Sequence, residues 1–157
     1  MIQHNRPKRL KLTWRQGGIY KDHETLWRDT LRRNPNTWLA HNNLGFVLER
    51  QGEIDKAIGY YRRAIELEPN QDKAYSNLAY VLTSRGQLDE ASKVYLEHLR
   101  IRPNNVNAQI NLGSVLYSLG RLQEAESHFR QALLIKPADA DAHSNLGIVL
   151  VSQGKVV

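Results

Sequence analysis

The 157-residue sequence contains no cysteine, which excludes a disulfide framework and any chemistry that depends on a thiolate. It also has no apolar run approaching the roughly 18 residues that a membrane-spanning helix needs. The N-terminal segment is basic but lacks the apolar stretch of a signal peptide. These absences are compatible with a cytoplasmic protein, which is the location we expect.

The motifs of common catalytic and metal sites are missing as well. The six histidines never pair at a spacing suited to metal ligands, and no Gly-x-Ser-x-Gly sequence is present. Gly154 and Lys155 lack the earlier glycine and the following hydroxyl residue of a phosphate-binding loop. We therefore expect a chain that is not an enzyme and that uses neither a metal nor a cofactor.

Proline is scarce but strictly spaced. Four of the five prolines lie 34 residues apart, and five glycines keep the same period. These positions are Pro35, Pro69, Pro103 and Pro137, with Gly18, Gly52, Gly86, Gly120 and Gly154. A shared period of this length indicates one supersecondary unit that is repeated in tandem.

Apolar and small residues follow the same period with internal spacings of four and three, which place them on one face of a helix. They are Leu44, Leu78, Leu112 and Leu146, each followed by Gly or Ala; Leu48, Leu82, Leu116 and Leu150; Ala57, Ala91 and Ala125; and the aromatics Trp27, Tyr61, Tyr95 and Phe129. In the first full unit this pattern predicts one helix over about residues 37–51 and a second over about 54–67.

The remaining periodic residues have predictable local roles. The glycine between the two helices permits a tight turn, and the proline ends the second helix. Asn36, Asn70 and Asn104 follow three of the prolines and are predicted to cap the next first helix. The small residue after each leucine is predicted to let two helix backbones approach closely, with the aromatic filling the space toward the next unit.

This set of Leu-Gly-x-x-Leu, Gly, Ala-x-x-x-Tyr and Pro-Asn motifs resembles the tetratricopeptide repeat over about residues 20–154. The resemblance implies an all-α, right-handed α-solenoid of helix-turn-helix units, with three full repeats flanked by half repeats. The expected divisions are a basic arm or degenerate helix at 1–19, a half repeat at 20–37, full repeats at 38–71, 72–105 and 106–139, a half repeat at 140–154, and a tail at 155–157.

One polar position also keeps the period, since Asn43, Asn77, Asn111 and Asn145 each precede the leucine of the first helix. In the family that the sequence resembles, first helices line the concave surface. An amide offers both donors and an acceptor to a peptide backbone. This asparagine series resembles the one in the repeat superhelix of O-linked N-acetylglucosamine transferase, where the asparagines hold substrate peptide. The alternative is that they bond neighbouring carbonyls or water.

The resemblance therefore implies a groove that binds an extended peptide or a segment of a partner protein. Side chains near the asparagines that are expected to contribute are Phe46, Arg50, Lys73, Tyr80 and Tyr117. The family's clamp for chaperone C-terminal carboxylates is disfavoured, because Asn42 and Ser76 stand where its first lysine is expected. His98 replaces an expected alanine and is predicted to crowd one helix junction, and His41 and His143 share a packing position.

The two ends of the array do not match. It opens with a second-type helix over about residues 20–33 and closes with a first-type helix over about 139–152, which would leave Leu146, Leu150 and Gly147 open to water. Three explanations remain: a fragment of a longer array, a partner that covers this face, or self-association. In the last, Tyr20, Trp27 and Leu31 of one copy dock against Leu146 and Leu150 of the next, by end-to-end or swapped packing.

Charge is concentrated at the N-terminus, where residues 1–36 contain nine Lys or Arg against three Asp or Glu. Such an arm is typical of a solvated leader, and the less favoured alternatives are contacts with nucleic acid or an anionic membrane. Two classes of function remain. One is a non-catalytic interaction scaffold; the other is the repeat region of a larger, membrane glycosyltransferase-like protein, which the stretch from Thr13 to Pro35 resembles.

Overall fold

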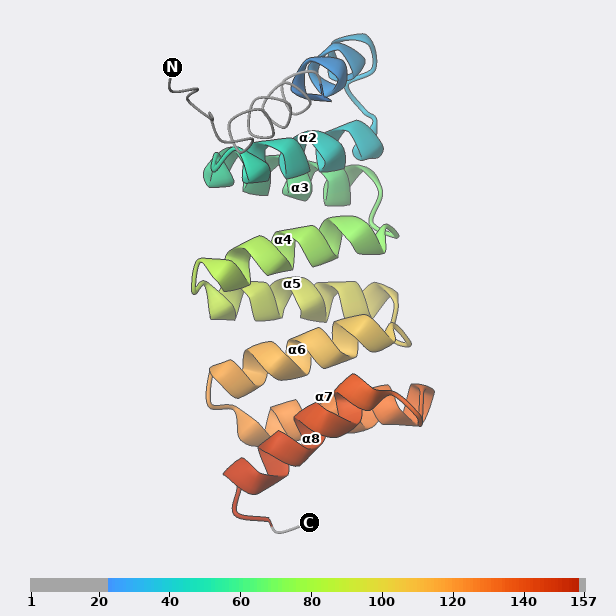
Figure 1. Ribbon diagram of the computed structural model, residues 1–157. Helices are drawn as coiled ribbons and strands as arrows, with labels where there is room; N and C mark the ends of the chain where they lie inside the picture. The colour runs from blue at the N-terminus through green and yellow to red at the C-terminus, as the bar shows by residue number, and fades with distance from the viewer. Residues whose placement is uncertain (1–22, 156–157) are drawn as a thin grey trace, which may run out of the picture. The chain divides into compact units, whose positions relative to one another are not determined.

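The computed structural model describes residues 23–155, and these residues are all in helices or in the short connections between them (Figure 1). Residues 23–33 are helical, which agrees with the second-type helix expected there, although its predicted start lies outside the described residues. Seven helices follow: α2 (Trp38–Arg50), α3 (Ile54–Leu67), α4 (Asp72–Ser84), α5 (Leu88–Ile101), α6 (Val106–Ser118), α7 (Leu122–Ile135) and α8 (Ala140–Ser152). The all-α class is confirmed, and the bounds of α2, α3 and α8 agree with the predicted ranges.

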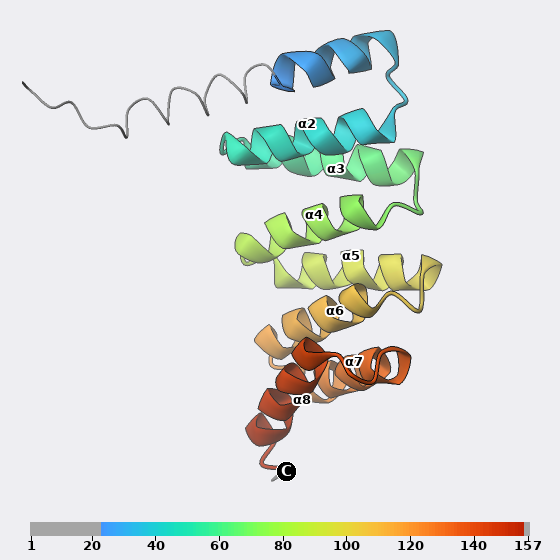
Figure 2. The same cartoon turned by 45° about the vertical axis from the view of Figure 1, so that its right-hand side comes forward.

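The chain divides into two compact units, residues 1–64 and 65–157. In the second unit each helix contacts the next along the chain, and α6 also contacts α8. Both views of the ribbon show α4, α6 and α8 on one side of this unit and α5 and α7 on the other (Figures 1 and 2). First helices therefore share one face of the second unit, and second helices share the opposite face.

The turn inside each repeat depends on a glycine in the left-handed region. Gly52, Gly86, Gly120 and Gly154 have φ angles between 72° and 83°. The residue that follows each glycine donates its backbone N–H to the carbonyl five residues before it. The Glu53 amide, for example, donates to the Leu48 carbonyl at 2.8 Å. This Schellman arrangement ends the first helix and reverses the chain, and it confirms the role predicted for these glycines.

The caps of the first helices lie one residue later than predicted. Asn105 accepts a hydrogen bond from the Ala108 amide at 2.9 Å, and Asp139 accepts one from the Ala142 amide at 3.1 Å. The prediction that Asn36, Asn70 and Asn104 cap these helices is wrong, because the residues at the N-cap positions are Thr37, Gln71, Asn105 and Asp139. Thr37 and Gln71 form no side-chain cap, so only the later helices gain this contribution of about 1 kcal/mol.

The core is built by pressing an aromatic ring from the second helix onto the small residue of the first. A Cβ added to Gly113 would lie 2.7 Å from the Phe129 ring, and one added to Gly45 would lie 2.8 Å from the Tyr61 ring. The predicted close approach of two backbones is therefore mainly an approach of a ring to a backbone. The two backbones also come close at Gly45, where the added Cβ would lie 3.3 Å from the Ala57 carbonyl oxygen.

A second repeated contact ties each first helix to the proline before it. The rings of His41 and His143 hydrogen-bond the carbonyls of Pro35 and Pro137, in each case at 2.8 Å through Nε2. Gln109, at the same position of its unit, donates to the Pro103 carbonyl at 3.2 Å. The interpretation of His41 and His143 as packing residues is confirmed.

The repeat that contains α4 and α5 forms a different contact at this position. Tyr75 takes the position of these polar residues and stacks on His98, with ring centroids 4.6 Å apart and an interplanar angle of 1°. His98 is 1% exposed and its Nε2 lies 2.8 Å from an Asp72 carboxylate oxygen. Burial would raise the pKa of Asp72, but the hydrogen bonds from His98 and Arg102 outweigh it and hold that pKa below its usual value. The predicted crowding is thus accommodated by stacking.

Gly113→Leu and Gly147→Leu form a matched test of the ring contact. Gly113→Leu forces the Phe129 ring away and is expected to lower the free energy of unfolding by about 1–3 kcal/mol. Gly147→Leu meets nothing within 4 Å and is expected to raise it by up to about 1 kcal/mol, because glycine is a poor helix former. Urea unfolding followed by circular dichroism measures both. Equal effects of the two substitutions would contradict this account of the core.

Candidate functional site

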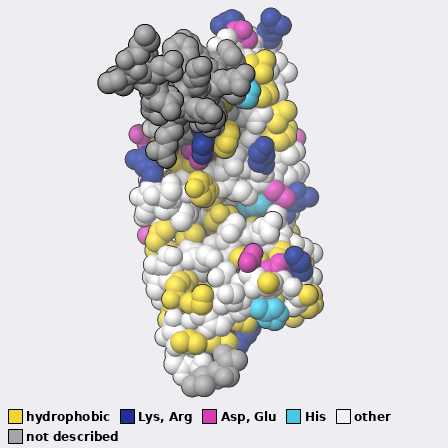
Figure 3. Space-filling view, viewed as in Figure 1, with side chains coloured by type: hydrophobic (Ala, Val, Ile, Leu, Met, Phe, Trp, Pro, Cys, Tyr) yellow, Lys and Arg dark blue, Asp and Glu magenta, His cyan; other side chains and the backbone are white. Residues whose placement is uncertain are grey.

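The face shared by the first helices carries large apolar side chains that are not part of the core. In the second unit Tyr80 is 65% exposed, Tyr117 38% and Ile148 48%, on α4, α6 and α8 respectively. Figure 3 looks onto this face and shows separate hydrophobic patches over α6 and α8, with white, uncharged surface between them. An apolar and uncharged polar surface of this kind is suited to another protein segment.

The predicted asparagines lie beside these side chains but are not equivalent to one another. Asn111 is exposed, whereas Asn77 and Asn145 are half-buried. In the first unit Asn43 is half-buried and accepts a hydrogen bond from its neighbour Asn42 at 3.2 Å. The structure therefore brings the asparagines of α4, α6 and α8 onto one face of the second unit, as the sequence predicts, but their local surroundings differ.

The difference between Asn111 and Asn145 has a simple cause in the core. The Asn111 side chain hydrogen-bonds the hydroxyl of Tyr95, which is 5% exposed. Burial raises the pKa of Tyr95, and the bond from Asn111 offsets part of that rise. At the corresponding place before Asn145 the ring is Phe129, which has no hydroxyl. Within residues 23–155 the Asn145 amide has no hydrogen-bond partner.

The Asn145 amide borders a small pocket between α6, α7 and α8. This pocket has a volume of about 160 Å³, and its lining includes Ser114, Tyr117 and Ile148. The hydroxyls of Tyr117 and Ser152 are 3.2 Å apart, which joins α6 to α8 at the pocket's edge. An amide open to solvent, two hydroxyls and apolar side chains thus meet at one place, and together they can form hydrogen bonds and apolar contacts with a ligand.

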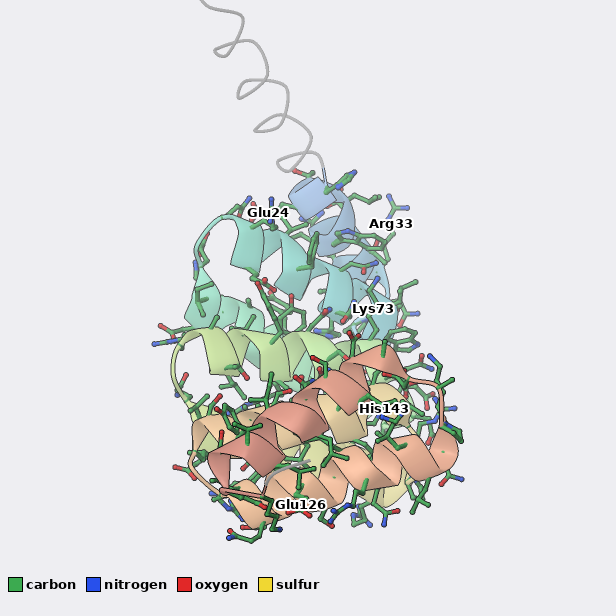
Figure 4. The ribbon with its side chains drawn as sticks, turned by 60° about the horizontal axis from the view of Figure 1, so that its bottom comes forward. Glu24, Arg33, Lys73, Glu126 and His143 are labelled. Atoms are coloured by element: carbon green, nitrogen blue, oxygen red, sulfur yellow. The ribbon has the colours of Figure 1, made fainter. Side chains whose placement is uncertain are left out.

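The other residues predicted to bind peptide are distributed over both units. Phe46, 46% exposed, and Arg50 lie on α2 in the first unit. Lys73 is exposed near the start of α4 (Figure 4). Neither Phe46 nor Lys73 lines the pocket beside Asn145, whereas Tyr117 does.

The residues predicted for self-association are partly accessible. Trp27 and Leu31 are half-buried on the helical segment 23–33, and Leu146 and Leu150 are half-buried on α8. The exposed large apolar residues of that last helix are instead Ile148, at 48%, and Val151, at 70%. Tyr20 lies outside the described residues. Leu146 and Leu150 are therefore less open than predicted, although nothing lies within 4 Å of a Cβ added to Gly147.

The one buried carboxylate of α7 has a structural role. Glu126 (Figure 4) is paired with Arg130, and Lys155, just after the turn that ends α8, donates to it at 2.8 Å. The hydrogen bond from Lys155 holds the pKa of Glu126 below its usual value. Residues 23–155 contain no cluster of three acidic or histidine side chains that could hold a metal ion. Their helices are all too short or too polar to cross a bilayer.

These features define an α-helical repeat protein of the class used for protein interaction. The tetratricopeptide repeat family model matches residues 38–71, and a second model of the same description matches residues 70–138. Together they account for more than half of the chain, so the chain belongs to the tetratricopeptide repeat family. This family is generally a non-catalytic module for protein interaction, and no catalytic family is among the matches.

Solved structures of similar fold include several of the protein MamA. One MamA crystal structure has 20% sequence identity and a TM-score of 0.77, covering 90% of this chain and 82% of its own. MamA from Desulfovibrio magneticus RS-1, from residue 41 to its end, has 18% identity and a TM-score of 0.75, covering 94% and 84%. At these identities the likeness shows the fold alone.

A third similar structure is the first repeat domain of Spaghetti (RPAP3), bound to the HSP90 peptide SRMEEVD. It has 19% identity and a TM-score of 0.67, and the match covers 74% of this chain and 93% of that one. No curated protein matches this chain in the sequence comparison.

The different surroundings of the two asparagines lead to a stability prediction. Asn111→Ala removes the partner of a buried hydroxyl and is expected to lower the free energy of unfolding by about 1–3 kcal/mol. Asn145→Ala removes no such partner and is expected to change it by less than about 0.5 kcal/mol. Adding Tyr95→Phe to Asn111→Ala should recover most of the loss. If urea unfolding gave the double variant no recovery, the Asn111–Tyr95 bond would not be the cause.

Proposed function

We propose that this chain is an interaction scaffold that binds an extended segment of a partner protein on its first-helix face, with the pocket beside Asn145 as the main contact. The observation that carries the proposal is the solvent-accessible Asn145 amide, which borders a pocket lined by Tyr117 and Ile148. Its polar atoms are accessible to water, which the backbone of a bound peptide can replace.

The chemistry of this face favours a backbone rather than a charged ligand. The Asn145 amide can donate to a peptide carbonyl and accept from a peptide N–H, while the Tyr117 ring packs against an apolar side chain of the segment. Each hydrogen bond contributes about 0.5–1.5 kcal/mol, so affinity requires several repeats to bind together. Tyr80, on α4 of the same unit, offers the next apolar contact along the face.

The HSP90-peptide complex of the similar structure suggests a competing ligand, a chaperone tail that ends in carboxylates. The face formed by α4, α6 and α8 is poorly suited to that ligand. Carboxylates are held best by paired cations, whereas Lys73 is the one cation among the residues of α4, α6 and α8 that were predicted to bind peptide. We therefore expect the peptide SRMEEVD to bind no better than a scrambled version of it.

A peptide-selection experiment tests the proposal. Segments selected from a random decapeptide library against the whole chain are labelled, and their affinities are measured by fluorescence anisotropy. Asn145→Ala and Tyr117→Ala are each expected to weaken binding roughly fivefold to tenfold, the effect of losing about 1–1.4 kcal/mol. Leu134→Ala, at a 74%-exposed position on α7, serves as the control and should leave affinity unchanged. Unchanged affinity in both face variants would refute the site.

Self-association is a second candidate, and the empty space at Gly147 favours it. At Gly45 and Gly113 an aromatic ring fills the corresponding space, and Trp27 of a second copy has the same phase in the period as those rings. Sedimentation is expected to show concentration-dependent association that Gly147→Leu weakens. A single monomeric species across a wide concentration range, for both proteins, would exclude this candidate.

A place for the array within a larger glycosyltransferase-like protein also stays a prediction. It is compatible with peptide binding, because a repeat region can present substrate segments to a neighbouring catalytic domain. An upstream series of membrane-spanning segments in the gene would support it.

A further inference from the structure

The helix α3 contains a glycine that neither a turn nor close packing explains. Gly59 lies near the middle of α3, where glycine weakens a helix relative to alanine. A Cβ added there would meet nothing within 4 Å, unlike one added to Gly45 in the same unit. The period does not require glycine either, because the corresponding residues are Lys93 on α5 and Ser127 on α7. The simplest reason for a glycine here is that the space beside it must stay open.

That space is a surface pocket within the first unit. The pocket has a volume of about 460 Å³, in the range of ligand sites, and Gly59 forms part of its wall. The segment 23–33, α2 and α3 all contribute to it. Its lining consists of Arg28, His41, Lys56, Gly59, Tyr60 and Arg63, which includes three cationic side chains and no carboxylate.

Two of the three cations of this pocket, Lys56 and Arg63, do not recur in the later repeats, whereas Arg28 corresponds to Arg62 and Arg130. One period further on, Lys56 corresponds to Glu90 and Arg63 to Glu97; two periods on, they correspond to Glu124 and Gln131. The repeat fold is therefore built equally well with the opposite charge at these positions. Since packing does not account for the basic side chains, a partner of complementary charge is the simplest reason for them.

Exposed ion pairs within the chain hold two of these cations, Arg28 and Lys56, and such pairs can exchange partners. Arg28 pairs with Glu24 at 2.7 Å, and Lys56 pairs with Glu53; the Arg28 and Lys56 side chains are 44% and 65% exposed. Exposed pairs of this kind contribute little to stability, so an incoming carboxylate can replace either acidic partner. Arg63, also exposed, has an interaction of its own within the chain.

The wall of the pocket is aromatic and fixed in position. The rings of His41 and Tyr60 lie with centroids 5.7 Å apart at an angle of 36°. His41 is held by the Pro35 carbonyl at 2.8 Å, and Arg28 hydrogen-bonds the Tyr60 hydroxyl. The two rings and the backbone at Gly59 together form a surface against which an apolar side chain can pack, and the cationic side chains lie around it.

We propose that this pocket binds an acidic segment of a partner protein, seating one apolar or aromatic side chain against Tyr60 and Gly59 while flanking carboxylates pair with Arg28, Lys56 and Arg63. The inference rests on the proposed function only in taking the chain to be an interaction scaffold. It adds a second binding site, made of other residues and selective for a different chemistry from the pocket beside Asn145.

The test uses the whole chain and a fluorescein-labelled decapeptide of glutamates with one central phenylalanine, with anisotropy measured in 50 mM and 300 mM NaCl. We expect saturable binding that weakens at least tenfold at the higher salt concentration. Gly59→Leu fills the pocket without changing charge and is expected to weaken binding at least tenfold, with an unchanged or raised melting temperature. Ser127→Leu, the same change at the corresponding position of α7, is the matched control and should bind like the unaltered chain.

Charge reversal provides the second arm. Lys56→Glu is expected to weaken binding at least tenfold, whereas Lys93→Glu on α5, which alters net charge equally, should have less than a twofold effect. A peptide with glutamine in place of glutamate should not bind. Asn145→Ala should leave the affinity unchanged, so that the two sites succeed or fail separately.

Three results would overturn the proposal. Equal affinities of Gly59→Leu and the unaltered chain would show that the peptide binds non-specifically to positively charged surface and not to the pocket. Displacement of the peptide by millimolar inorganic phosphate would indicate a small-anion site instead. If the chain self-associated and Lys56→Glu abolished that association, the occupant would be an acidic second helix of another copy, such as α5 with Glu90 and Glu97.

Discussion

The fold depends on one repeated contact, an aromatic ring of the second helix pressed against a residue with little or no side chain on the first. Tyr61 and Phe129 lie so close to Gly45 and Gly113 that even a methyl group would force a shift. This contact sets the separation of the two helices in a unit. The proline-carbonyl bonds and the glycine turns then fix where helices begin and end, and in the second unit α4, α6 and α8 share one face.

Periodicity made the architecture predictable, since every copy must satisfy the same packing. The sequence predicts a second helix at 54–67, which are the bounds of α3, and it predicts the glycine turns and the first-helix asparagines. It misplaces the caps by one residue because Asn104 and Asn105 are adjacent and both are good capping residues. Residue type cannot decide between them; only the backbone conformation, with Asn105 extended at φ −77° and ψ 101°, does so.

What sequence patterns could not supply is the difference between copies. The pairing of Asn111 with Tyr95, and the lack of such a partner for Asn145, depend on which aromatic stands one helix earlier, a relation visible only when α5 and α6 are placed together. The pocket around Gly59 is not predicted by the period, because residues that line it differ from one repeat to the next. Its signal in the sequence is a mid-helix glycine among lysine and arginine side chains.

The bond between Tyr95 and Asn111 crosses from one repeat to the next, and this has an evolutionary consequence. Every first helix from α2 to α8 offers an asparagine at the receiving position. If a gene rearrangement removed residues 106–139, Tyr95 would face Asn145, and its hydroxyl would still find an amide. Loss of that repeat would therefore leave the Tyr95 hydroxyl paired, so this bond does not by itself fix the number of repeats.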